Sequence, residues 1–199
     1  LETIIQFCTL LDVIQCKSYN ASKYNYSKPT IAEETDGSFF SAKKLRHPLI
    51  EHLQKNELYV ANDLELGTDE QKGVLLYGTN AVGKSSMIRS IGIVIVLAQS
   101  GMFVPCESLT FSPYHSIFTR ILGNDNIFKS QSTFAVEMSE LRTILQLANK
   151  NSLILGDELC SGTESDSAIS IFVSGLMKLH EFNSSHIFAT HFHEIVSMD

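Results

Sequence analysis

The residues best suited to chemistry form one glycine-bracketed loop, Gly-Thr-Asn-Ala-Val-Gly-Lys-Ser, at residues 78–85. The pattern fits G-x-x-x-x-G-K-[ST], which cradles phosphates when a strand precedes it and a helix follows it. Its glycines let the backbone curl, so that successive N–H groups converge on a phosphate. We therefore predict phosphate contacts from the loop and the serine after it: Gly78, Thr79, Asn80, Ala81, Val82, Gly83, Lys84, Ser85 and Ser86.

Two side chains of this loop have individual predicted roles. Lys84 would supply a mobile cation to the β- and γ-phosphates, and the Ser85 hydroxyl would be a ligand for Mg²⁺. The helix that follows would present the positive end of its dipole to the anion. A nucleoside triphosphate with its magnesium ion is the ligand that this chemistry predicts.

The second half of such a site is an acidic residue at the end of an apolar strand. Residues 152–158 read Ser-Leu-Ile-Leu-Gly-Asp-Glu and supply it. Asp157 would reach the magnesium through water, and Glu158 would polarise the attacking water. A glutamate directly after the magnesium aspartate suggests the ABC-type P-loop ATPases, in which two nucleotide domains enclose two ATP molecules. The predicted cofactors are therefore ATP and Mg²⁺.

Short apolar strands alternate with helices around these motifs. Strands are expected at residues 73–77, 152–158 and 185–191, and helices at 84–100, 132–150 and 165–180. This alternation predicts an α/β fold whose mostly parallel sheet is covered by helices on both faces. Ahead of it, residues 1–16 have the apolar spacing of a helix and residues 17–30 have the polar composition of a connector. A domain boundary near Tyr24 is therefore expected.

Charge and cysteine usage exclude several classes of function. The net charge of −7 and the dispersed Lys and Arg residues argue against a domain that grips DNA by itself, which needs a basic stripe. The four cysteines form no C-x-x-C pair, so an intracellular, reducing compartment is expected. The longest apolar run, residues 91–98, is far shorter than the roughly 20 residues that span a bilayer, so no membrane partner is expected.

Several ordered blocks of sequence resemble the ATPase domain of the MutS family, the DNA mismatch-recognition proteins. The resemblance covers residues 24–199 and leaves residues 1–23 as the end of a helical lever domain. It leans toward the viral and organellar branch, and ordered blocks are more specific than the phosphate loop alone. The blocks are LRHPLIE (45–51), LYVANDLEL (58–66), GTNAVGKSSMIRS (78–90), IFTRILGNDN (117–126), STFAVEMSE (132–140), DELCSGTES (157–165) and FATHFHEI (188–195).

This resemblance implies further site residues. Tyr59 would stack on the adenine, with Asn62 in the same base-contacting segment, although a tyrosine here also fits an aromatic in a core seam. Ser132 and Thr133 would reach the γ-phosphate bound by the partner subunit, and Ser132 would also suit the cap of its own helix. His191 would sense the γ-phosphate and help to position water.

Two segments depart from the family pattern. The family has a glycine two residues before the signature serine, where this chain has Ser130, which lacks the conformational freedom of glycine. After the catalytic glutamate the family reads Ile-Gly-Arg-Gly-Thr, whereas residues 159–163 read Leu-Cys-Ser-Gly-Thr. These changes alter the predicted contact with the opposite nucleotide, while the phosphate loop and both carboxylates are intact.

The resemblance implies an ATPase motor domain that couples ATP binding and hydrolysis to the state of a DNA-bound clamp. Its partners would be a second MutS-type subunit, identical or different, and mismatched double-stranded DNA held by domains outside this chain. A C-terminal dimerisation element would follow residue 199. The alternatives are a nucleotide-gated scaffold with little turnover, a recombination-control ATPase of the same superfamily, and a transporter nucleotide domain, whose L-S-G-G-Q-like signature this chain lacks.

Overall fold

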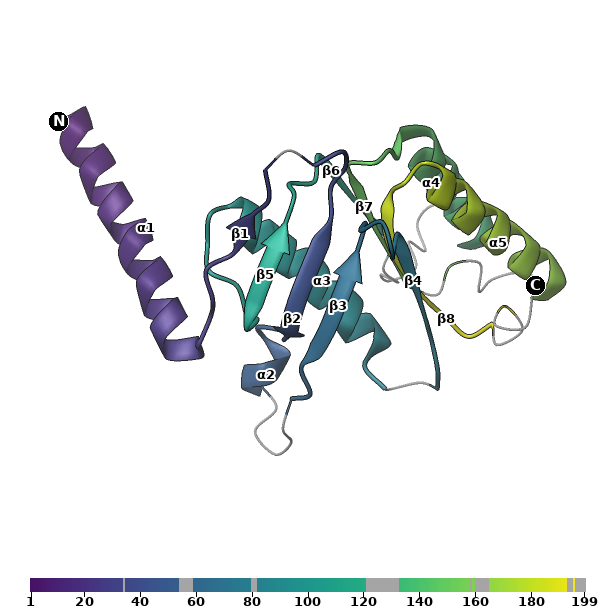
Figure 1. Ribbon diagram of the computed structural model, residues 1–199, viewed down its shortest axis with the longest axis horizontal. Helices are drawn as coiled ribbons and strands as arrows, with labels where there is room; N and C mark the ends of the chain where they lie inside the picture. Colours follow the sequence, from purple (N-terminus) through teal and green to yellow (C-terminus); the bar gives the residue numbers. More distant parts are fainter. Residues whose placement is uncertain are drawn as a thin grey trace.

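The computed structural model describes residues 1–33, 35–53, 59–79, 82–120, 133–157, 159, 165–192 and 195. Helices and strands alternate through most of this length (Figure 1). In chain order they are α1 (Glu2–Tyr24), β1 (Thr30–Ile31), β2 (Phe40–Leu45), α2 (Ile50–Leu53), β3 (Asn62–Leu66), β4 (Gly73–Tyr77), α3 (Lys84–Gln99), β5 (Ser108–Phe111), β6 (Ser116–Arg120), α4 (Thr133–Leu147), β7 (Ser152–Asp157), α5 (Ser165–Glu181) and β8 (Ser185–Thr190).

One four-stranded sheet is parallel throughout and has the strand order β4-β8-β7-β6. Every residue of β7 and β8 is buried. Strands that are covered on both faces have continuous apolar sequences, so they can be predicted from the sequence. The strands predicted at β4, β7 and β8 are therefore confirmed, and β6 at the edge of the sheet was not predicted.

A second four-stranded sheet, with the order β1-β5-β2-β3, corrects the prediction of a mostly parallel fold. β2 pairs antiparallel with both β5 and β3, whereas β1 runs parallel to β5. In β2 the buried residues Phe40, Ala42 and Leu45 are separated by exposed or partly exposed ones. Such mixing is typical of a sheet with only one face on the core, and strands this short give a weak sequence signal.

α3 lies between the two sheets, as Figure 1 shows, and forms the centre of the core. Its fully buried Ile91 and Ile95 pack with Phe40 of the second sheet and Leu155 of the parallel sheet. On the other face of the parallel sheet, α4 and α5 enclose a separate apolar cluster that includes Phe172. Both faces of the parallel sheet are thus covered by helices, as predicted.

α1 stands apart from the two sheets, and none of its residues is buried. The helix continues to Tyr24, so the prediction of a connector from residue 17 is wrong. Near the C-terminal end of the helix, the Lys23 ammonium donates a hydrogen bond to the Tyr19 hydroxyl, one turn earlier, at 2.9 Å. Asn25, with a φ of 53°, then ends the helix in the left-handed conformation. No helix in the described part of the chain is long and apolar enough to cross a membrane.

Candidate active site

The phosphate loop connects the end of β4 with the first turn of α3. β4 ends at Tyr77 and α3 begins at Lys84, so the strand–loop–helix order that the motif requires is present. Gly78 has a φ of 152° and Gly83, the N-cap of α3, has a φ of 96°. An added Cβ at Gly83 would meet no described atom within 4 Å, so the backbone conformation, rather than space, accounts for glycine at this position.

The Lys84 side chain folds back onto this loop. Its ammonium donates hydrogen bonds to the carbonyl oxygen of Gly78, at 2.6 Å, and to that of Thr79, at 2.9 Å. The charge is therefore held against the loop, where a phosphate oxygen would be a stronger acceptor than a carbonyl. Gly83 provides no side-chain cap, and the first turn of α3 contains no acidic residue. The N–H groups and the positive end of this helix are thus available to an anion.

Asp157 lies at the same edge of the parallel sheet as the loop. β8 lies between β4 and β7, and the register pairs Tyr77 with Thr190 and Asp157 with Ala189. The carboxyl ends of the three strands therefore meet. Asp157 is only 4% exposed, and its Oδ1 makes no hydrogen bond with any described residue. A buried carboxylate oxygen without a partner is costly, and a cation would compensate that cost.

The oxygen atoms at this edge fit a magnesium ion that is bound by the protein and by a phosphate together. Among the described residues, no group of three or more His, Cys, Asp or Glu side chains could hold a metal ion unaided. Mg²⁺ commonly keeps several waters and takes one or two protein oxygens together with phosphate oxygens. The unpartnered Oδ1 of Asp157 and the hydroxyl of Ser85, a half-buried residue in the first turn of α3, are donors of this kind.

His191 directly follows β8 and is exposed. The Thr190 before it is buried, and its hydroxyl accepts the Phe192 N–H at 3.1 Å, which fixes the chain as it leaves the sheet. Because Thr190 pairs with Tyr77, His191 emerges beside the strand that carries the phosphate loop. The backbone therefore places His191 at the edge that holds the loop and Asp157.

The predicted adenine contacts belong to the second sheet. Tyr59 is half-buried ahead of β3, and Asn62 is the first residue of that strand. Burial raises the pKa of the Tyr59 hydroxyl, and the Asn62 amide donates a hydrogen bond to the Val60 carbonyl at 3.2 Å. In Figure 1 the starts of β3 and α3 lie at the same lower end of the view. Half-burial is compatible with a stacking role and with an aromatic in a core seam, so adenine stacking by Tyr59 stays a prediction.

The other predicted residues are only partly covered by the structure. Val82 is 62% exposed and Ser86 is half-buried in the first turn of α3. Thr133 is the first residue of α4. Outside the described residues lie Asn80, Ala81, Ser132, Glu158 and the loop at 160–164, together with Ser130.

The structure also contains an ionic cluster at this edge that was not predicted from the sequence. Arg120, the last residue of β6, has its guanidinium 3.3 Å from Glu137 and 2.8 Å from Glu140, both on α4. The signal that could have identified it is a charged residue that ends an apolar strand, which is the feature that identified Asp157.

Fold and sequence together define an α/β protein with a G-x-x-x-x-G-K-S loop at the carboxyl edge of a parallel sheet. Residues 74–199 match the family described as MutS domain V. The mitochondrial DNA mismatch repair protein mutS homolog of Sarcophyton glaucum is 41% identical over 199 residues, which cover 98% of this chain and 20% of that protein. The chain belongs to the MutS family.

Two further relatives come from a virus and a bacterium. The putative DNA mismatch repair protein mutS homolog of Acanthamoeba polyphaga mimivirus is 38% identical over 234 residues, covering 100% of this chain and 21% of the relative. DNA mismatch repair protein MutS of Alkaliphilus oremlandii is 37% identical over 190 residues, covering 94% of this chain and 21% of the relative. The chain thus spans about a fifth of the length of the curated relatives that it matches.

Proposed function

We propose that this chain binds and hydrolyses ATP and acts as the motor domain of a MutS-type mismatch repair protein. The observation that carries the proposal is the carboxyl edge of the parallel sheet. There the Lys84 ammonium lies on the phosphate loop, and the buried, unpartnered Oδ1 of Asp157 lies two strands away, across β8. This pair of charges is complementary to a triphosphate and its metal ion.

In the proposed reaction, water attacks the γ-phosphorus while the bond to the bridging oxygen of ADP breaks, and that oxygen keeps the electron pair. Glu158 would accept the proton of the water, and His191 would help to orient it. Lys84 and the N–H groups of the loop would stabilise the charge on the phosphate oxygens. Ser85 and Asp157 would hold a magnesium ion, which would supply further positive charge to the phosphate oxygens.

The proposal includes a dimer of such domains. ATP would close the dimer, and Ser132 and Thr133 at the start of α4 would complete the partner's site. The names of the relatives, which describe DNA mismatch repair proteins, support a role on mismatched DNA. The net charge of −7 supports DNA contacts outside this chain.

The proposed ATPase function is tested by measuring ATP binding and the steady-state rate of ATP hydrolysis of the variant Glu158→Gln. We expect ATP binding to be retained and turnover to fall by about 100-fold or more, because a general base contributes about 10²–10⁴-fold. Glu181→Gln, which makes the same change at an exposed position on α5, is the matched control and should have wild-type turnover. If the wild-type chain binds ATP but shows no turnover at any concentration, or after fusion to a dimerising helix, a nucleotide-gated scaffold replaces the ATPase.

A further inference from the structure

Arg120 and Asp157 lie on opposite faces of the parallel sheet, at the same carboxyl edge. The register of β6 and β7 places Arg120 opposite Gly156, the residue before Asp157. Leu155 packs in the cluster around α3, whereas Phe118 packs in the cluster around α4 and α5. Since alternate residues of a strand share a face, Asp157 lies on the α3 face and Arg120 on the α4 face.

The Arg120 guanidinium is held between two carboxylates of α4. Its Nη2 donates to Oε1 of Glu137 at 3.3 Å, and its Nε lies 2.8 Å from Oε2 of Glu140. Nε and that oxygen make no hydrogen bond with described residues, so this second contact is electrostatic. Glu137 is 2% exposed, Arg120 15% and Glu140 45%. The planar guanidinium of arginine presents its N–H donors in a fixed fork, whereas lysine has one compact ammonium on a flexible stem.

The cluster is more acidic than its own members can balance. Two carboxylates share one guanidinium, and Oε2 of Glu137 is buried without a hydrogen-bond partner among the described residues. Removing the one cation would leave an uncompensated buried charge, which proteins avoid. The position of α4 is therefore tied to the end of β6 by a charge contact that is costly to break from one side.

The contact lies near the start of the helix. Glu137 is four residues after Thr133, which corresponds to about 6 Å along the axis of α4. Farther along, Leu141 and Ile144 anchor the same helix through apolar contacts. Apolar contacts are not directional, whereas a guanidinium–carboxylate contact is. The orientation of the first turn of α4 thus depends on Arg120.

We propose that Arg120 is a positioning residue, which aligns the first turn of α4 with the edge that carries Asp157. The inference rests on the proposed function, in which this turn completes the ATP site of the partner subunit. Arg120 acts through Glu137 and Glu140 and does not touch the nucleotide bound by its own chain. Loss of Arg120 would lower ATP turnover at the site shared by two subunits, and it would leave nucleotide binding by each single subunit unchanged.

The test compares Arg120→Lys, Glu140→Gln and, as a matched control on the same helix, exposed Arg142→Lys. For each variant, kcat and KM for ATP, affinity for ADP, and amide hydrogen exchange of α4 without nucleotide are measured. For Arg120→Lys we expect kcat to fall about 10- to 100-fold, because small misplacements of positioning groups cost about this much. KM and ADP affinity should stay at wild-type values, and exchange at the start of α4 should accelerate. Arg142→Lys should resemble the wild type.

Unchanged exchange at the start of α4 would overturn the proposal, whatever the turnover. A loss of ADP affinity in parallel with kcat would also overturn it, because that pattern indicates general damage. If Arg120→Lys does not fold, Glu140→Gln decides, with faster exchange at the start of α4 and unchanged ADP affinity expected. A wild-type chain without turnover would refute the proposed function, and the exchange measurement would still decide whether Arg120 holds α4.

Discussion

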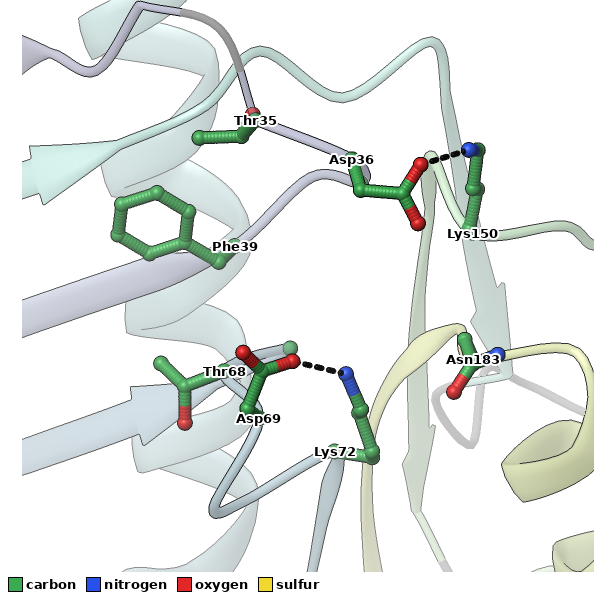
Figure 2. A pocket seen from close by; sticks show the side chains of 10 residues that line it. Thr35, Asp36, Phe39, Thr68, Asp69, Lys72, Lys150 and Asn183 are labelled. Atoms are coloured by element: carbon green, nitrogen blue, oxygen red, sulfur yellow. Dashed lines mark hydrogen bonds and ion pairs between the residues drawn. The ribbon is translucent and has the colours of Figure 1, made fainter.

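The two ends of the parallel sheet differ in whether their polar side chains have partners. At the amino end, a cavity of about 610 Å³ opens between the two sheets. Figure 2 shows its charged side chains in pairs: Lys150 lies 2.6 Å from Asp36, and Lys72 lies 3.3 Å from Asp69. Both aspartates are exposed, and the Lys150 ammonium lowers the pKa of Asp36. Each charge here has a partner and a route to water.

Beneath that cavity a buried polar chain is also satisfied. The Tyr114 hydroxyl donates to Oγ of Ser185 at 2.9 Å, and this Oγ donates to the Ser38 carbonyl at 3.1 Å. Burial raises the pKa of the Tyr114 hydroxyl, so it remains a donor. Tyr114 lies between β5 and β6, and Ser38 lies just before β2, so these hydrogen bonds tie two connecting segments to the start of β8.

At the carboxyl end the pattern is reversed. Oδ1 of Asp157 and Oε2 of Glu137 are buried without hydrogen-bond partners among the described residues, and the Lys84 ammonium rests on backbone carbonyls. Buried polar groups are normally paired, so leaving two acceptors unpaired at one edge has a stability cost. The comparison indicates that the amino end is internally paired, and it supports the proposed ATP site at the carboxyl end.

Lys84→Ala is expected to have the largest effect. Truncating one partner of a desolvated charge contact costs about 2–5 kcal/mol, so Mg-ATP should bind about 30-fold more weakly or worse. Isothermal titration calorimetry measures the loss. Lys72→Ala makes the same change at the amino end and should leave the affinity unchanged. Equal losses in the two variants would remove the distinction between the ends.

Asp157→Asn should separate stability from activity. Replacing a buried, unpartnered carboxylate by a neutral amide is expected to raise the free energy of unfolding by about 1 kcal/mol without nucleotide. Magnesium-dependent turnover should be lost in the same variant. Urea denaturation and an ATPase assay on one preparation test both statements. A lower free energy of unfolding would mean that Asp157 already has a structural partner.

Tyr114→Phe should have the opposite profile. The variant leaves Oγ of Ser185 one donor short, so we expect the free energy of unfolding to fall by about 1 kcal/mol. For a chain of this length, that lowers the Tm by about 2–4 °C. ATP affinity should equal that of the wild type, and calorimetry measures both quantities. A weakened affinity would show that the two ends are coupled.

The smallest expected effect is a pH dependence that arises from His186. Burial lowers the pKa of this imidazole, and the Ser184 carbonyl that its Nδ1 contacts partly opposes the shift. Below the ordinary pKa of 6.5, the unfolded chain therefore binds more protons than the folded chain, so stability falls as the pH drops. His186→Gln should flatten this slope in urea denaturation. His47, whose pKa burial also lowers, should maintain a residual slope.

Apolar runs and one spacing motif were sufficient to predict the parallel sheet, its helices and the phosphate loop. The second sheet could not be predicted in the same way, because β2 reads Phe-Ser-Ala-Lys-Lys-Leu and buries only Phe40, Ala42 and Leu45, without a regular alternation. The contact of Arg120 with Glu137 was equally hidden, because it joins a strand to a helix that begins after a long intervening segment. The roles of Glu158 and Ser132 stay predictions.

The order of the strands has a consequence for how the chain is made. β8 hydrogen-bonds to both β4 and β7, and it follows both of them in the sequence. Until the ribosome has released residues 185–190, no strand joins β4, which carries the loop with Lys84, to β7, which ends at Asp157. Because synthesis proceeds from the amino end, the nascent chain carries two half-sites that cannot cooperate. A bound nucleotide can therefore stabilise this arrangement only after β8 has been inserted between them.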